Sequence, residues 1–136
     1  RNFSQGHCSC ADGIVKSIFS NSSSVVFSNQ EWRIIPDPKN SDSPLGVHYT
    51  AWAADEDKMT AANLKYHHFE ALRALLGQGG RAVALQAGLH ESDLRAFVHL
   101  PPNIFRMHVH FVHKNASRSG DEIQLHDVLQ AISVNT

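Results

Sequence analysis

Two histidines and an arginine alternate along one short segment in the C-terminal half of the chain. Residues 105–112 read FRMHVHFV, which places Arg106, His108 and His110 at steps of two. Successive side chains of a β-strand point to opposite faces, so these three would share one face. His99, on the preceding predicted strand, would face them if the residues between form a hairpin. One imidazole could then attack a phosphorus atom while the other cationic or polar groups stabilise the developing charge.

The same pair of imidazoles could instead be half of a metal site, or two histidines without a chemical role. A metal site needs a third ligand, which is often a carboxylate, and no acidic residue lies near this segment in the sequence. We therefore expect no metal ion and no cofactor. The other seven of the ten histidines, including His48 on an earlier strand and His126 on the last helix, are expected to have no role.

The rest of the pattern predicts one α+β domain with an antiparallel sheet of about five strands and helices packed on one face. The expected strands are 25–27, 32–35, 47–53, 94–100 and 105–113. A stripe of apolar residues from Met59 to Ala87 predicts one long helix, which runs through three glycines because the stripe resumes in phase at Val83. Gly88 would cap it. A final helix is predicted to open at Gly120–Asp121 with Ile123 facing inward.

Composition limits the possible partners. The domain is expected to span residues 1–136, with residues 1–12 as a flexible segment. Twelve basic against 13 acidic residues give a net charge of -1, which does not suit a protein that grips long nucleic acid through many phosphates. No apolar run reaches the roughly 18 residues that a membrane span requires. Cys8 and Cys10 are too few for a zinc finger. We therefore expect a cytoplasmic protein, with the nucleus as an alternative location.

The histidine segment resembles the signature of the histidine triad family, His-φ-His-φ-His-φ-φ, with Arg106 in place of the first histidine. Residues 99–111, HLPPNIFRMHVHF, align without a gap with the run HYLPSYYHLHVHF of the scavenger mRNA decapping enzyme family. Residues 34–39, IIPDPK, are similar to the cap-binding Ile-Pro-Asp-x-Lys segment of that family. The resemblance covers roughly residues 14–132 and corresponds to the C-terminal catalytic domain of these enzymes.

This resemblance implies catalytic roles for three histidines. His108 matches the nucleophile that forms a covalent nucleotidyl-histidine, and His110 matches the third histidine, which positions the phosphate. His99 matches a histidine beside the phosphates. The implied activity is hydrolysis of the pyrophosphate linkage in short mRNA remnants that carry a 7-methylguanosine cap, and family members of this fold pair as homodimers.

The resemblance also implies substrate-binding positions. Asp37 matches an acid that binds the edge of 7-methylguanine, Pro38 stands where a residue packs on the base, and Lys39 matches a phosphate contact. Asn103 stands at the position of a family serine, next to a tyrosine whose hydroxyl lies near the phosphates. Arg106 is expected to contact the phosphates. The expected partner is thus a capped dinucleotide or a short capped oligonucleotide.

Several departures from the family pattern leave two alternatives open. Ser28 stands where the family has a base-binding glutamate, no tryptophan stands where the family stacks the methylguanine, and the first triad histidine is absent. The chain could therefore be a general histidine triad hydrolase or transferase with another base specificity. It could also be a module that binds caps or nucleotides without turnover.

Overall fold

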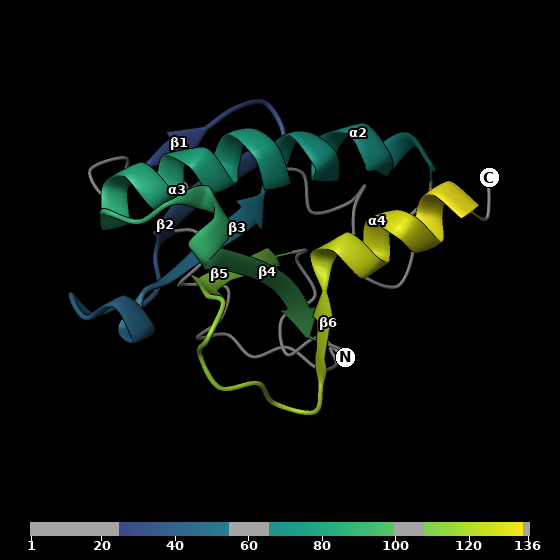
Figure 1. Cartoon of the computed structure of the whole chain (residues 1–136). Coiled ribbons are helices and arrows are strands. Elements are labelled where there is room, and N and C mark those ends of the chain that lie inside the picture. The colour runs from purple at the N-terminus through teal and green to yellow at the C-terminus, as the bar shows by residue number, and fades with distance from the viewer. Residues whose placement is uncertain (1–24, 55–65, 100–107, 135–136) are drawn as a thin grey trace, which may run out of the picture.

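A single six-stranded sheet organises the molecule. The computed structural model describes residues 25–54, 66–99 and 108–134. The strands follow the order β1-β2-β3-β5-β4-β6, and every neighbouring pair is antiparallel. Their bounds are β1 (Phe27–Ser28), β2 (Trp32–Pro36), β3 (His48–Ala53), β4 (Leu94–His99), β5 (His108–His113) and β6 (Glu122–Gln124). The antiparallel sheet is confirmed, with one strand more than the sequence predicts (Figure 1).

The helix that crosses the sheet is continuous through its glycines, as the phase of the apolar stripe predicts. It consists of α2 (Tyr66–Ala74), a π-helical turn at Leu75–Gly79 and α3 (Gly80–Ala87). A Cβ atom on Gly79 would lie only 2.9 Å from a methyl carbon of Ile34 on β2, so this glycine lets the helix approach the sheet. Gly88 ends the helix with φ of 73°, the left-handed conformation that favours glycine. The predicted start of the helix lies outside the described residues.

The final helix begins later than the sequence predicts. Residues Glu122–Gln124 form β6, which pairs with β4, and α4 (Leu125–Val134) follows it directly. Ile123 is 37% exposed instead of facing inward from a helix, so that prediction is wrong. The free edge of β4 offers these residues ladder hydrogen bonds, and a local pattern of apolar residues carries no signal for such a distant pairing.

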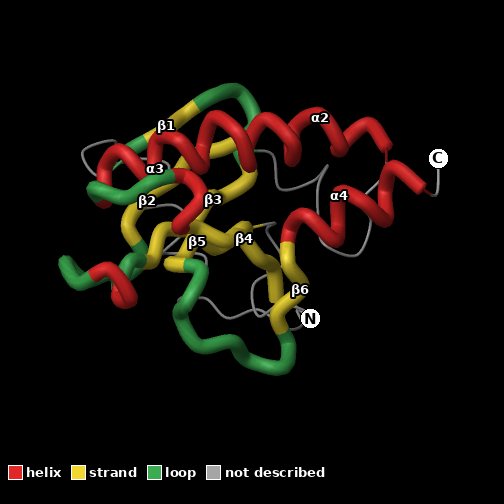
Figure 2. Tube along the Cα trace, viewed as in Figure 1, coloured by secondary structure: helices red, strands yellow, loops and turns green. Residues whose placement is uncertain are grey.

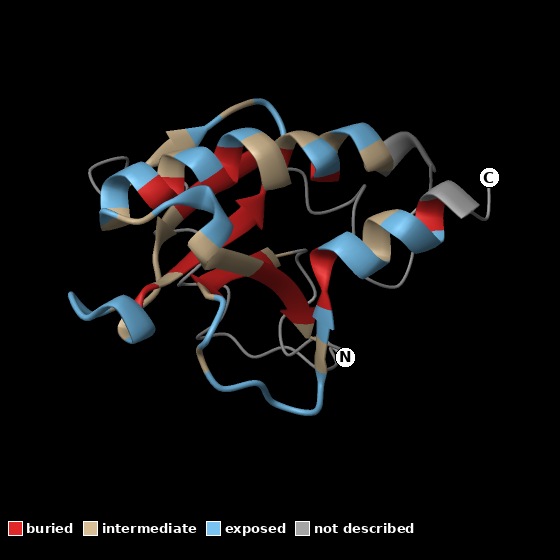
Figure 3. Ribbon diagram, in the orientation of Figure 1, coloured by how far each residue is buried: buried red, intermediate tan, exposed pale blue. Residues whose placement is uncertain are grey.

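The hydrophobic core lies between the sheet and the helices α2, α3 and α4, which cover one face (Figure 2). The central strands β3 and β5 are buried at consecutive positions, and α4 lies beside α2 (Figure 3). Trp32 is fully buried there, and its indole N–H donates a hydrogen bond to the Ala71 carbonyl on α2 at 3.1 Å. The largest fully buried side chains are Trp32, Phe111, Ile34, Leu72, Leu75, Leu125, Val83 and Val109.

Some of the predictions concern residues outside the described part of the chain. The expected flexible segment 1–12 lies outside the described residues, as do Asn103 and Arg106. Within the described part of the chain, no helix is long and apolar enough to cross a membrane.

Candidate active site

Strand pairing gathers the candidate histidines on the face of the sheet opposite the helices. On β5, Val109 and Phe111 enter the core, so His108 and His110 point to the other face, as predicted. In the β3–β5 register, Thr50 lies opposite His110 and Trp52 lies opposite His108. Residues that pair across neighbouring strands share a face, so polar and aromatic side chains from β3, β4 and β5 meet there. We call this the site face.

His108, the candidate nucleophile, is held by two rings. Its imidazole stacks on the indole of Trp52, with centroids 4.6 Å apart and an interplanar angle of 19°. The edge of the same imidazole faces His110 at 5.2 Å. Trp52 is buried on the site face, where it fixes the plane of the His108 ring.

His110 is the most buried histidine among the described residues, with 9% of its surface exposed. Its ring stacks on Phe97, and its Nδ1 shares a hydrogen bond of 2.9 Å with Nε2 of His48. Burial, together with the neighbouring imidazoles of His108, His48 and His99, lowers the pKa of His110 to about 3. The ring is therefore neutral at physiological pH. Its Nε2 is buried and has no hydrogen-bond partner within residues 25–54, 66–99 and 108–134.

Asp37 lies just after β2 and points toward these histidines. Its carboxylate accepts hydrogen bonds from the Thr50 hydroxyl and from the Lys39 backbone N–H, both at 3.0 Å, and lies 3.8 Å from Nε2 of His48. Burial raises the pKa of Asp37, but the Lys39 N–H bond, the charge of His48 and the Thr50 bond outweigh it and lower the pKa overall. The side chains of Pro38 and Lys39 are exposed beside it.

His48 lies within the site, although the sequence predicts no role for it. Burial lowers its pKa, against the opposing effect of the Asp37 carboxylate. The ladder between β3 and β5 places its ring against His110. The alternation of His48, Thr50 and Trp52 along their strand was the signal that could have identified it.

His99 reaches the same cluster from β4. Its ring edge lies 4.9 Å from His110, which confirms the expected placement on a neighbouring strand. Its Nδ1 is 3.0 Å from the Asp121 carboxylate, in the loop between β5 and β6. This contact orients the His99 ring at the edge of the site.

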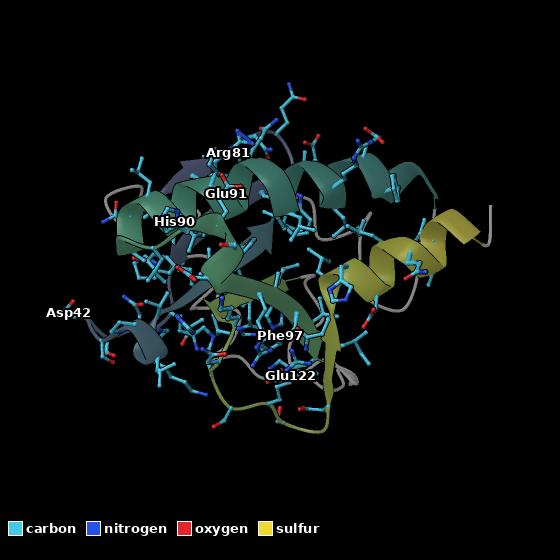
Figure 4. The ribbon with its side chains drawn as sticks, in the orientation of Figure 1. Asp42, Arg81, His90, Glu91, Phe97 and Glu122 are labelled. Carbon is cyan, nitrogen blue, oxygen red and sulfur yellow. The ribbon has the colours of Figure 1, made fainter. Side chains whose placement is uncertain are left out.

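A buried ion pair supports that loop. Arg95 on β4 donates to Glu122 at 2.7 Å and to the carbonyl oxygens of Ala116 and Ser117 at 3.1 Å. In Figure 4, Phe97 and Glu122 lie on the side of the sheet away from α2 and α3. Arg95 carries no motif of its own in the sequence, although it alternates with Phe97 and His99 along one strand.

Asp37, His48 and His110 are also the described residues that could hold a metal ion, since one donor atom from each lies within 4.8 Å of the others. No acidic residue lies near the histidine segment in the sequence, yet the structure brings a carboxylate to the histidines. Asp37 is distant in sequence, and the pairing of β2 with β3 and of β3 with β5 brings it to the cluster.

Comparisons with known proteins agree with the observed fold. A family model described as scavenger mRNA decapping enzyme C-term binding matches residues 9–126. No curated protein sequence matches the chain. Among solved structures, Hnt3 in complex with DNA and guanosine is 12% identical, with a TM-score of 0.50 over 83% of this chain and 72% of that chain. The aprataxin ortholog Hnt3 from Schizosaccharomyces pombe is also 12% identical, with a TM-score of 0.52 over 74% and 55%. These structures share the fold.

Proposed function

We propose a function from one premise: the chain belongs to the family of the scavenger mRNA decapping enzyme C-terminal binding domain, whose model matches residues 9–126. The match and the histidine triad fold support a nucleotide hydrolase of the histidine triad type. The proposed substrate is a short mRNA remnant with a 7-methylguanosine cap. A homodimer and a cytoplasmic location belong to the proposal on the family resemblance alone.

The observation that carries the proposal is the row of imidazoles on the site face. A ring nitrogen of His108 attacks the phosphorus next to the 7-methylguanosine, a P–N bond forms, and the P–O bond to the leaving nucleotide breaks. Water then cleaves the P–N bond and releases 7-methylguanosine monophosphate. The stacking of Trp52 on His108 supports this role, since it limits rotation of the attacking ring.

The state of His110 supports its role beside the phosphate. In the tautomer in which Nε2–H of His48 donates to Nδ1 of His110, the neutral His110 ring carries its proton on Nε2, and that buried nitrogen has no partner in the described part of the site. It can therefore donate to a phosphate oxygen as charge develops there. His99 and the exposed Lys39 would contact the other phosphates.

One observation favours a second candidate, a nucleotide hydrolase with a different base specificity. Both oxygens of the Asp37 carboxylate already accept hydrogen bonds, from Thr50 and from Lys39. These two hydrogen bonds fix the orientation of the carboxylate, so only its remaining acceptor positions can meet the edge of a methylated purine. Equal turnover of methylated and unmethylated substrates would support this second candidate.

The test compares purified protein with a His108→Ala variant on a 7-methylguanosine cap analogue and its unmethylated counterpart. We expect 7-methylguanosine monophosphate as product and a loss of at least about 1,000-fold in kcat when the nucleophile is removed. His126→Ala, which removes an exposed histidine from α4, is the matched control and should keep full activity. Mass spectrometry of protein denatured at alkaline pH, where the P–N bond survives, should detect a nucleotide attached to His108.

Tight binding of the cap analogue without turnover, unchanged in His108→Ala, would reject the hydrolase and leave a nucleotide-binding module.

A further inference from the structure

We propose that Asp37, His48 and His110 form a site for one divalent metal ion of the zinc class. The donor atoms of the three side chains lie within 4.8 Å of one another. Nε2 of His48 is 2.9 Å from Nδ1 of His110 and 3.8 Å from Oδ2 of Asp37. The site goes beyond the proposed function, which uses His110 but requires no metal.

These separations suit a small metal ion. Zinc binds histidine nitrogens and carboxylate oxygens at about 2.0–2.2 Å, so its ligand atoms lie roughly 3–4 Å from one another. Of the two distances at His48, 3.8 Å lies in this range and 2.9 Å lies just below it. Two histidines and one carboxylate are also a recurring ligand set of catalytic zinc and non-haem iron sites, in which water or substrate takes the remaining positions.

Neighbouring groups hold the ligands as outer contacts do in metal sites. The Thr50 hydroxyl and the Lys39 N–H each donate to one oxygen of Asp37, which fixes the carboxylate. Phe97 stacks on His110 and fixes its ring plane. Because His48 and His110 lie on paired strands, the separation of their backbones is set by the ladder between β3 and β5.

Access and charge also permit an ion. The side chains of His48 and Asp37 are each 17% exposed, so the cluster opens to solvent. Asp37 contributes one negative charge next to two imidazole nitrogens, and the hydrogen bond from Lys39 to Asp37 comes from the backbone N–H. Without a metal the same groups form a hydrogen-bonded cluster, and that simpler state is the competing outcome of the test.

The experiment starts from the full chain with Cys8→Ser and Cys10→Ser, because thiolates bind zinc strongly and would hide a second site. After treatment with a chelator, Zn²⁺ is titrated by calorimetry and Co²⁺ by visible absorption. We expect one ion per chain and the absorption bands of nitrogen- and oxygen-ligated cobalt. His48→Ala should weaken binding at least about 100-fold, and Thr50→Val, which removes only an outer contact, about 10-fold.

His126→Ala should bind like its parent, and circular dichroism confirms that each variant is folded. The proposal is overturned if the parent binds no ion, or if folded His48→Ala binds as tightly as the parent. No nucleotide is present in the titration, so failure here leaves the proposed hydrolase untouched. Failure of cap turnover likewise leaves the metal result intact.

Discussion

Two arginine–glutamate pairs on opposite sides of the sheet differ in burial. Arg81 on α3 and Glu91 lie 3.3 Å apart with side chains 65% and 55% exposed. Arg95 and Glu122, on the site face, lie 2.7 Å apart with side chains 8% and 7% exposed. Figure 4 shows the first pair beside the helices and Glu122 on the far side of the sheet. The helix side is stabilised by apolar packing, while the site face contains buried charge.

This difference tells us what each face does. An exposed pair contributes little to stability, since water screens it and two flexible side chains must be ordered. A buried pair does not need to add stability either, but it becomes costly when one partner is lost. The Arg95 pair also anchors the loop that carries Asp121, the partner of His99. The site face therefore contains polar contacts in place of purely apolar packing, and these contacts position its imidazoles.

The largest expected effect comes from breaking the two pairs in the same way. Glu122→Gln should lower the free energy of unfolding by about 3 kcal/mol or more, because it leaves the Arg95 charge buried without its partner. Glu91→Gln should cost less than about 1 kcal/mol. Urea unfolding of both variants measures this. Equal losses in the two variants would show that the pairs are equivalent and would remove the contrast between the faces.

The next effect is the acid sensitivity of the site face. His110 has a pKa of about 3 in the folded protein, against about 6.5 when unfolded, so the unfolded chain binds more protons between these values. The contribution of neutral His110 to the free energy of unfolding is therefore complete above pH 6.5. It falls as the pH decreases, by up to about 1.4 kcal/mol per pH unit. Between pH 6.5 and 4.5 we expect a loss of roughly 2–3 kcal/mol.

Urea unfolding in a chelator across this range tests that expectation. His110→Gln removes the titrating group, so its stability should change less with pH. Burial also lowers the pKa of His48, so His48 contributes a further loss of stability as the pH falls. The His110→Gln variant retains this contribution. A slope in His110→Gln equal to that of the parent would assign the acid sensitivity elsewhere.

The smallest effect lies on the helix side, at two glycines of the π-helical turn. Gly79→Ala should cost about 1–3 kcal/mol, because its Cβ would lie 2.9 Å from methyl carbons of Ile34 and Leu75. Gly77→Ala meets no atom within 4 Å and should be neutral or stabilise by up to about 1 kcal/mol. Thermal unfolding separates the two. Equal melting temperatures would mean that the helix does not approach the sheet as closely as the structure has it.

The long helix in the middle of the chain and the short strand β6 near its C-terminus show where sequence patterns succeed and where they fail. The continuous helix through Gly77 and Gly79 was predictable, since an apolar stripe that keeps its phase reports burial directly. Residues 122–124 were predicted as helix and form β6, because their pairing partner on β4 is distant in sequence. A local pattern of apolar residues carries no information about pairing with a strand that is distant in sequence.

The site divides in the same way. Strand periodicity alone placed His108 and His110 on one face and Val109 and Phe111 on the other, since the alternation is a property of a single extended segment. The motif in that segment also identified the family. His48, Asp37 and Arg95 join the site through strand pairing, which joins segments far apart in the chain, and only the tertiary structure decides that register. Burial then neutralises His110, because the loss of hydration penalises its charged form once the strands have assembled.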